Sequence, residues 1–584
     1  MTNKEMVLSE DYVDLLLDAP IPPGSIPQGS EYFIQEVDER LDIMYRESDS
    51  IPLFNIKSFN YQTIPAVYGL MQNGTESPPA TPTAPTTVTF DPSALLKSGI
   101  LEIQREPLSL TGRGVVVGFV DTGIQYDNEV FRNPDGSTRI MGIWDQTIQT
   151  GEPPGGFVYG TEYNQEIINQ ALRSENPREI VPSYDENGHG TAMASVAAGS
   201  VLGSGLSFQG AAPDADIVVV KLKEAKSNLK EYFLIADGVP AYSEADIIMA
   251  LKYLQSYAIS FQRPLVICLG IGTNMGDHTG SSALGGYLNR LAITRSNAVI
   301  VCGGNEGNSS HHYEGELTHA VSEVDYEEVE IRVGDNEKGF WAELWANLPA
   351  TLSVSIRTPG GETTETVNFR SREERHFTFV YVDTEIEIDY VLVEQNSGAQ
   401  LIIMRFSKPT PGVWTIRVTS EETIAGQIDR FHIWLPISQF LTSNTYFLQP
   451  SPYFTLTEPS LAKEVITTST YNDANNSFFA ESGRGYRRDG EIKPNLASPG
   501  VNIDTILGRR TGSSIAAAIT AGASAQFMQW AVVEKNNIYT ESRELKSFLV
   551  RGAQRTQDMI YPNREWGFGR LNIAETFDRM AGLD

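Results

Sequence analysis

Four apolar runs of strand length, separated by helical segments, restrict the fold of this chain more than any other feature. VVVGFVD, DIVVVKL, PLVICLGIG and NAVIVCGGN occupy residues 115–121, 216–222, 264–272 and 297–305. Segments with helical patterns, such as TAMASVAAGSVL, lie between them. Apolar strands that alternate with helices are typical of βαβ units, in which a parallel sheet is buried between helices. The pattern therefore predicts an α/β fold with its chemistry at the carboxyl ends of the strands.

A different pattern interrupts this one between residues 325 and 450. Segments such as EEVEIRV, LSVSIRT, ETVNFRS and VWTIRVT alternate apolar and polar residues with period two, and turns such as PGGE separate them. Short strands at this spacing favour an antiparallel β-sandwich of the jelly-roll kind. Because the α/β pattern resumes after residue 455, we interpret the segment as a domain inserted into the first fold.

The N-terminal region has its own character. Residues 1–72 mix short helical and strand patterns and predict a small α+β unit, and NGTESPPATPTAPTTV then reads as an exposed, extended linker. The predicted organisation is listed in chain order: an N-terminal unit (1–72), a linker (73–92), the first part of the α/β domain (93–324), the sandwich (325–450) and the second part of the α/β domain (451–584).

Charge and composition exclude several classes of function. The 584 residues carry a net charge of −30, which argues against a general binder of nucleic acid or anionic membranes. Two cysteines, Cys268 and Cys302, are too few for a disulfide scaffold and are expected to be buried. No run approaches the ~18 apolar residues of a membrane span, and the start lacks the apolar core of a signal peptide. We therefore expect no membrane span and a cytoplasmic location.

Four short motifs carry chemically useful side chains. Asp121 ends the run 115–121, His189 and Ser514 each open a helical segment, and Asn305 follows the run that begins at residue 297. Taken singly, each motif is typical of a turn or a helix cap. Their joint occurrence in the order Asp, His, Asn, Ser, each at a strand end or a helix start, favours a catalytic interpretation.

These residue types suit nucleophilic acyl transfer. A serine hydroxyl is a poor nucleophile at neutral pH, so His189 would take the Ser514 proton and later deliver it to the leaving amine. Asp121 would orient the imidazole. The free N–H groups at the helix start and the Asn305 amide would stabilise the oxyanion.

The motifs resemble those of the subtilisin-like serine proteases, the subtilases, over about 110–310 and 455–575. KPNLASPG (493–500) and WGFGRLN (566–572) resemble two further segments of that family. The resemblance implies a subtilisin-like three-layer fold, a triad of Asp121, His189 and Ser514, and an oxyanion hole at Asn305. No cofactor is predicted. Many subtilases bind calcium, but the chain has no Asp-x-Asp-x-Asp loop, so no metal is predicted either.

The resemblance also suggests a substrate-binding wall. Leu269, Gly270, Ile271, Gly303 and Gly304 match the backbone against which subtilases hold a substrate as an added strand. Glycine that allows tight packing at strand ends is an equally good interpretation of the same residues.

Within the subtilases the chain most resembles the Csp-type germination proteases of clostridial spores, in segments such as IPAVYGLM, RIMGIWDQT and GNEGNSSHHY. This likeness implies that 1–72 is a prodomain, an intramolecular chaperone and inhibitor that the enzyme cleaves between Met71 and Asp91. The prodomain and a protein substrate, expected to be a spore-cortex-lytic zymogen, would be the partners, in the cytoplasm or the spore.

Three features depart from these patterns or leave alternatives open. The usual Gly-Thr-Ser-Met-Ala-x-Pro is altered at Ser513, Ile515 and Ala518. A general intracellular subtilase and a non-catalytic pseudoprotease remain as alternatives, although the intact triad argues against the second. His311 and His312 lack further metal ligands at suitable spacing and are expected in a surface loop or at the rim of the cleft.

Overall fold

The computed structural model describes residues 1–18, 31–47, 60–71, 90–203, 207–318, 326–368, 374–420 and 427–582. The predicted linker, 73–92, lies outside the described residues except for residues 90–92. Among the described residues, no helix is both long enough and apolar enough to span a bilayer.

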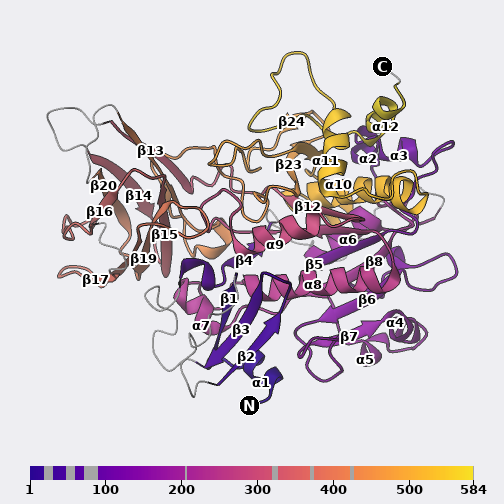
Figure 1. Cartoon of the computed structure of the whole chain (residues 1–584), viewed down its shortest axis with the longest axis horizontal. Helices are drawn as coiled ribbons and strands as arrows, with labels where there is room; N and C mark the ends of the chain where they lie inside the picture. The colour runs from indigo at the N-terminus through magenta and orange to yellow at the C-terminus, as the bar shows by residue number, and fades with distance from the viewer. Residues whose placement is uncertain are drawn as a thin grey trace, which may run out of the picture.

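A nine-stranded sheet forms the centre of the α/β domain (Figure 1). Its strands follow the order β24-β23-β12-β10-β5-β8-β6-β7, with β25 beside β23. The four apolar runs form β5, β8, β10 and β12, which pair in parallel, so the predicted α/β fold is confirmed. The strands are β5 (Val116–Asp121), β6 (Ile140–Asp145), β7 (Thr161–Asn164), β8 (Asp216–Lys221), β10 (Leu265–Leu269), β12 (Asn297–Cys302), β23 (Ile466–Asn472), β24 (Ser477–Phe478) and β25 (Leu496–Pro499).

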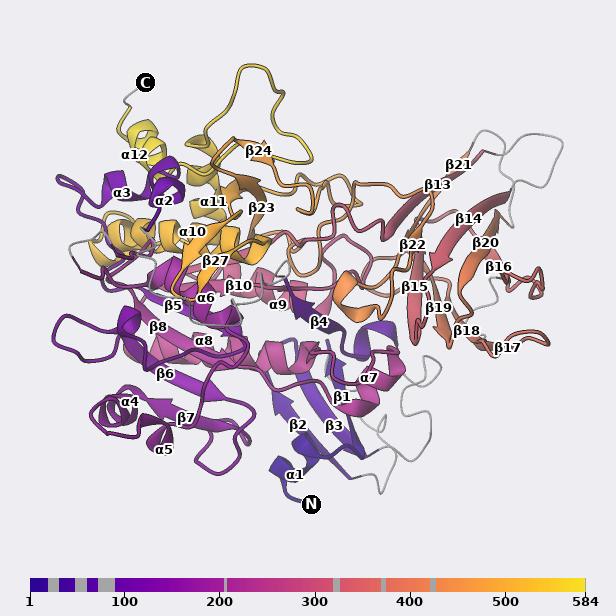
Figure 2. The ribbon, with the colours of Figure 1, turned by 180° about the vertical axis from the view of Figure 1, so that it is seen from behind.

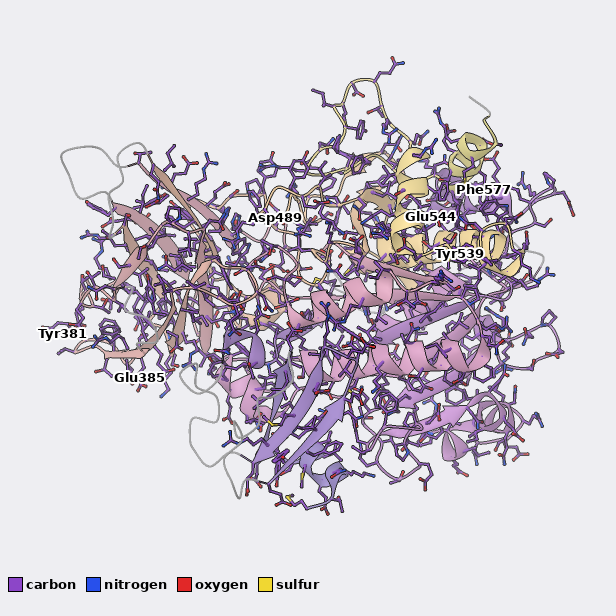
Figure 3. The ribbon with its side chains drawn as sticks, viewed as in Figure 1. Tyr381, Glu385, Asp489, Tyr539, Glu544 and Phe577 are labelled. Atoms are coloured by element: carbon purple, nitrogen blue, oxygen red, sulfur yellow. The ribbon has the colours of Figure 1, made fainter. Side chains whose placement is uncertain are left out.

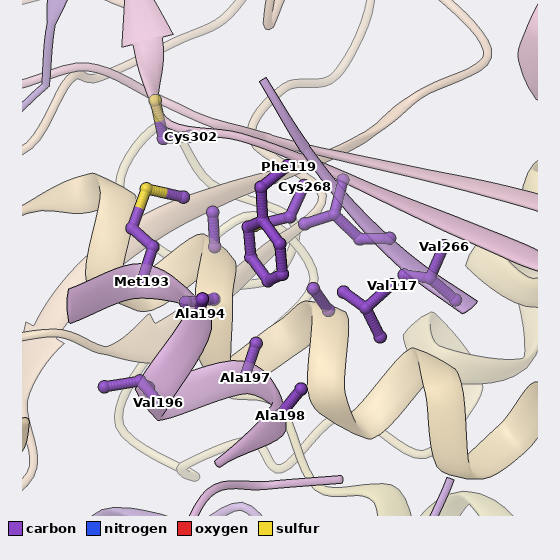
Figure 4. Close-up of a cluster of buried hydrophobic side chains, with 14 of the residues drawn as sticks. Val117, Phe119, Met193, Ala194, Val196, Ala197, Ala198, Val266, Cys268 and Cys302 are labelled. Carbon is purple, nitrogen blue, oxygen red and sulfur yellow. The ribbon is translucent and has the colours of Figure 1, made fainter. Parts of the chain in front are cut away.

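Helices cover both faces of this sheet and give three layers. On β5, Val117 and Phe119 belong to the apolar cluster that includes α6 (His189–Ala198) and α10 (Ser513–Met528). Val116 and Val120, on the opposite face, pack with α8 (Glu244–Phe261) and α9 (Ala283–Ala292). Figure 4 shows the first face, with side chains of α6 against those of β5 and β10.

Shorter elements complete the α/β domain. They are α2 (Ser93–Lys97), α3 (Ile100–Ile103), α4 (Gln165–Leu172), α5 (Pro177–Ile180), α7 (Ser227–Tyr232), α11 (Ser542–Arg551), α12 (Ile573–Ala581), β26 (Ile503–Thr505), β27 (Gly508–Arg510), the 3₁₀ helix η2 (Glu129–Phe131) and the π-helical turn η4 (Gln529–Val533).

The N-terminal unit is a small sheet with one helix. Its elements are α1 (Asn3–Leu8), β1 (Tyr12–Leu17), β2 (Tyr32–Glu36) and β3 (Asp42–Glu47), with β3 in the middle of the sheet. It lies beside α7 and α8 (Figures 1 and 2). A 3₁₀ helix, η1 (Tyr61–Thr63), then leads into β4 (Val67–Leu70), which leaves this unit and pairs with β9 (Tyr242–Ser243) and β11 (Ile271–Gly272) of the α/β domain.

Two antiparallel sheets, which we call the inserted sheets, lie within residues 312–447, at the far end of the molecule from α12 (Figure 2). Tyr381 and Glu385 mark their outer end in Figure 3, opposite Phe577 of α12. The inner faces of the two sheets share one apolar cluster. The six-stranded sheet, in spatial order, is β13 (His312–Thr318), β21 (Ile428–Trp434), β15 (Gly339–Ala346), β19 (Gln400–Ser407), β18 (Glu385–Val391) and β17 (Glu374–Thr378). The four-stranded sheet is β16 (Leu352–Arg357), β20 (Gly412–Ser420), β14 (Tyr326–Val333) and β22 (Tyr446–Phe447).

Two details differ from the sequence pattern. The first strand, β13, precedes residue 325, where the period-two pattern becomes continuous. In ETVNFRS, residues 369–371 lie outside the described residues, and the described part contributes only an isolated bridge at Val367. The 3₁₀ helix η3 (Ser438–Phe440) follows β21 on the way back to the α/β domain.

Candidate active site

Three chain segments meet at the carboxyl edge of the central sheet. Asp121 is the last residue of β5, His189 is the first residue of α6, and Ser514 is the second residue of α10. Since α6 and α10 pack on the same face of the sheet and on each other, both helix starts lie beside the end of β5. The fold therefore brings together three residues that are far apart in the sequence.

The three side chains lie within hydrogen-bond distance of one another. His189 Nδ1 is 2.8 Å from Asp121 Oδ1 and 3.0 Å from Asp121 Oδ2, and His189 Nε2 is 2.9 Å from Ser514 Oγ. All three residues are buried, with at most 3% of their surface exposed. An ionised carboxylate only accepts hydrogen bonds, so His189 Nδ1 must carry the proton that it donates to Asp121. In the neutral ring, Nε2 is then free to accept the hydrogen bond of the Ser514 hydroxyl.

The surroundings of His189 favour its charged form. Burial opposes the imidazolium, but the Asp121 carboxylate and its hydrogen bond outweigh burial and raise the pKa of His189 above its ordinary value. A positive charge that forms on the ring during a reaction would thus be stabilised within the site.

Asp185, which sequence reasoning missed, fixes the start of α6. Its carboxylate accepts hydrogen bonds from the backbone N–H groups of Gly188 (2.7 Å) and Thr191 (2.9 Å) and from the Thr191 hydroxyl (2.6 Å). These bonds satisfy N–H groups at a helix start that lack partners within the helix. An acidic residue four positions before His189 was the available signal, because acidic residues are typical of helix starts.

Gly190 explains why the helix can approach β5 so closely. A Cβ at this position would overlap the carbonyl oxygen of Gly123, which follows the β5 strand, and would lie 3.2 Å from Asp121 Oδ1. Only glycine therefore allows His189 to reach Asp121 at this distance.

A donor for an oxyanion lies beside the serine. Asn305 follows β12, and its Oδ1 accepts a hydrogen bond from the Ser513 N–H at 2.9 Å. This bond orients the side-chain amide, and its Nδ2 is buried without a hydrogen-bond partner in the part of the chain that the structure describes. A buried donor without a partner is costly unless a ligand or reaction intermediate uses it.

A segment of the N-terminal region lies beside the triad as an extended strand between two strands of the α/β domain, and we call the place between these two strands the cleft. β4 is the middle strand of a three-stranded antiparallel sheet between β9 and β11, with Leu70 opposite Ile271 and Gly69 opposite Gly272. The Met71 N–H donates to the Gly270 carbonyl at 2.8 Å, and the Ser514 N–H lies 3.5 Å from the Met71 carbonyl oxygen. The Met71 carbonyl group therefore faces the start of α10, where Ser514 lies.

The five residues that were expected to form the substrate-binding wall do not all lie beside β4. Gly270 and Ile271 contact β4, whereas Leu269 is a buried side chain in the core on the α8 face of the sheet. The Gly303 N–H donates to the Thr468 carbonyl at 2.9 Å, and Gly304 has a φ of +88°.

Gly272 lies against the Met71 side chain, because a Cβ at this position would be 3.2 Å from Met71 Sδ and would overlap Thr457 Oγ1. A Cβ on Gly304 would likewise lie 2.6 Å from Thr457 Cγ2. Thr457, from the segment after the inserted sheets, therefore lines the same region as these two glycines. Nothing in its local sequence signals this position.

Two further groups of residues can be compared with their expected positions. Cys268 and Cys302 are free and buried, as expected, and lie in the cluster drawn in Figure 4. The expectation of a surface position for His311 and His312 is wrong, because both are buried. His311 Nδ1 lies 2.7 Å from Glu306 Oε2, and the His312 ring stacks on Trp434. In the described ranges, no group of three or more His, Cys, Asp or Glu side chains could hold a metal ion.

The fold and the Asp–His–Ser arrangement define a class of protein, the serine peptidases with a parallel-sheet core, and comparison with known proteins narrows it. The model of the subtilase family matches residues 112–384 and 451–569, more than half of the chain. The chain belongs to the subtilase family, as the sequence motifs predicted.

Three known proteins are similar to this chain over different shares of its length. The structure of the CspB protease of Clostridium perfringens is 29% identical, with a TM-score of 0.74, and the match covers 84% of this chain and 98% of that one. Serine protease AprX of Bacillus subtilis is 32% identical over 140 residues, which are 24% of this chain and 23% of AprX. Subtilisin-like protease SBT3.5 of Arabidopsis thaliana is 25% identical over 223 residues, which are 34% of this chain and 26% of SBT3.5. The chain thus matches about a quarter of the length of these two relatives.

Proposed function

We propose that this protein is a serine endopeptidase in which Asp121, His189 and Ser514 form the catalytic triad, and that its first substrate is its own chain, at the bond that follows Met71. The observation that carries the proposal is the seating of β4 in the cleft, with the Met71 carbonyl oxygen 3.5 Å from the Ser514 N–H. A chain held in this way places its carbonyl carbon beside the hydroxyl that is hydrogen-bonded to His189.

The reaction proceeds by acyl transfer. Ser514 Oγ attacks the Met71 carbonyl carbon while His189 Nε2 takes the hydroxyl proton, and Asp121 stabilises the imidazolium. The oxyanion that forms on the Met71 oxygen accepts hydrogen bonds from the Ser514 N–H and from Asn305 Nδ2. His189 then protonates the leaving amine, and the C–N bond breaks. Water hydrolyses the resulting ester by the same route, which regenerates Ser514 and frees the Met71 carboxylate.

In this scheme the prodomain would be residues 1–71, one residue shorter than the 1–72 that the sequence predicted. A buried ion pair of 2.6 Å joins Asp14 to Lys226, and Lys226 Nζ also donates to the Tyr12 carbonyl. A second ion pair of 2.6 Å joins Asp38 to Arg290. These contacts hold the unit on the start of α7 and on α9, independently of β4. Cleavage after Met71 would therefore leave β4 in the cleft as an inhibitor.

Later substrates would be other proteins, cut at few sites. Support comes from the likeness to the CspB protease and from a cleft that β4 fills. We propose limited proteolysis of a spore-cortex-lytic zymogen in germination, with the protein in the cytoplasm or the spore. Incubating the cleaved protein with such a zymogen should give one defined shortening of the zymogen; an unchanged zymogen would support a general protease instead.

Self-cleavage can be tested on a gel. The wild-type chain should give two fragments, whereas the Ser514→Ala chain should stay at full length. Fragments of equal size from both chains would mean that another protease makes the cut, and full-length protein from both would favour a non-catalytic pseudoprotease.

A further inference from the structure

The segment that returns from the inserted sheets to the α/β domain covers the strand in the cleft. This segment contains Ile437 and η3, which begins one residue later. Ile437 and Phe440 are buried in the same apolar cluster as Met71, and the Phe440 ring lies 6.1 Å from that of Trp341 in β15. The returning segment thus packs into the apolar cluster that contains Met71.

Gln439 from this segment is held at both ends of its amide. Its Oε1 accepts a hydrogen bond from the Leu70 N–H at 3.0 Å, and its Nε2 donates to the Pro240 carbonyl at 2.7 Å. Pro240 lies just before β9, which pairs with β4 in the three-stranded sheet. The side chain therefore spans from the strand to the wall and has little freedom to move away.

Gly69 lies directly beneath these side chains. A Cβ at this position would be 2.6 Å from Ile437 Cδ1 and 2.9 Å from Gln439 Oε1, both closer than real Cβ atoms approach other groups. Gly69 is not among the residues with positive φ, so its backbone could be adopted by any residue. Glycine is favoured here for space and not for conformation, since a larger residue would have to move Ile437 and Gln439.

The segment that contains Ile437 and η3 is also hydrogen-bonded to the loop that carries Asn305. The Ser438 N–H donates to Glu306 Oε1 at 3.0 Å, and Glu306 in turn contacts His311. Glu306 directly follows Asn305, so displacing the segment would disturb the loop that carries the oxyanion donor. A substrate must therefore fit beneath Ile437 and Gln439 instead of pushing them aside.

We propose that Ile437 and Gln439 are specificity-determining residues that restrict substrates to extended peptides with glycine at the third position before the cut bond. The inference rests on the proposed function, because it takes β4 as the model of a bound substrate with Met71 at the first position. Even an alanine methyl at the third position would have to displace Ile437 Cδ1 and Gln439 Oε1, and the peptide N–H at the second position is recognised by Gln439.

The rate of self-cleavage of the full chain, measured during cell-free synthesis, tests whether Ile437 and Gln439 select glycine. Gly69→Ala should slow the cut at least about tenfold, the usual effect of forcing one methyl group into a packed site. Adding Ile437→Val and Gln439→Ala removes the two opposing groups and should restore the rate to within about threefold of the same double variant with Gly69. Adding Gln439→Glu alone, which keeps the size of the side chain, should not restore it. Equal rates for wild type and Gly69→Ala, or no rescue by the double variant, would overturn the inference while leaving the triad intact.

A second measurement does not depend on cleavage. In the Ser514→Ala chain, amide hydrogen exchange at Leu70 and Met71 reports whether β4 is docked, since these N–H groups bond to Gln439 and Gly270. Gly69→Ala should accelerate exchange at both amides. Adding Ile437→Val and Gln439→Ala should restore slow exchange at Met71. Unchanged exchange in Gly69→Ala would contradict the inference, whether or not the wild-type chain cuts itself.

Discussion

At the scale of single residues, a few buried polar groups set the geometry of the site. The order of motifs in the sequence predicted that Asp121, His189 and Ser514 lie together, because strand ends and helix starts share one edge of a parallel sheet. Asp185 and Gln439 escaped prediction for a physical reason. Both act through hydrogen bonds to backbone groups. Gln439 leaves no signature in residue type or spacing, and the acidic residue before His189 is only the weak signal of a helix start.

Asn305 provides the first prediction at this scale. Replacing it by Ala should slow self-cleavage by about 10²–10³, the usual effect of losing one oxyanion donor. Asn305→Asp is the matched control, because it keeps an acceptor for the Ser513 N–H but loses the Nδ2 donor. It should be slowed to a similar degree, and a rate near wild type in either variant would mean that another group stabilises the oxyanion.

Asp121 provides the second prediction, which concerns the pH dependence of the self-cleavage rate. Neutral His189 is the base, so activity is present above its pKa and is lost as the pH falls through it. Since Asp121 raises that pKa, Asp121→Asn should move the acid limb of the self-cleavage rate to lower pH and reduce the plateau rate by about 10⁴. An acid limb at the wild-type pH would show that Asp121 does not control the imidazole.

At the scale of elements, the sequence predicted the parallel strands and their helices well, because apolar runs and helical periodicity are local signals. It did not predict that β4 pairs with β9 and β11, because nothing in the local sequence VYGL indicates with which strands it will pair.

The cap of α6 gives an element-scale prediction. Asp185→Ala removes the acceptor for three donors at the helix start, and should lower the free energy of unfolding by about 1–2 kcal/mol and slow self-cleavage by displacing His189. Asp185→Asn keeps one side-chain oxygen and should fall between. Denaturant unfolding and the cleavage rate check this; an Asp185→Ala chain that matches wild type in both would remove Asp185 from the account.

At the scale of the whole molecule, three parts of the chain meet on one buried carboxyl group. Glu343 in β15 accepts hydrogen bonds from the Tyr61 hydroxyl (2.9 Å), the Gly276 N–H (2.9 Å) and Trp345 Nε1 (3.0 Å). Tyr61 belongs to the N-terminal region and Gly276 to the α/β domain. No sequence pattern predicts such a meeting, because Tyr61 lies 282 residues and Gly276 67 residues from Glu343, and each appears ordinary in its own segment.

Glu343 makes stability depend on pH. Burial raises its pKa from 4.5 to about 7, although its hydrogen bonds oppose this. The folded state therefore binds more protons than the unfolded state between these values, so stability should fall as the pH rises from about 5 to 7. Glu343→Gln should flatten this decline, measured as the denaturant midpoint against pH. An equal slope in the variant and the wild type would contradict the assignment.

The most direct test of the central claim is the mass of the N-terminal fragment released by the wild-type chain. We expect a fragment whose last residue is Met71, made by the wild-type chain and absent from Ser514→Ala. A fragment that ends at any other residue, or the same fragment from the Ser514→Ala chain, would contradict it.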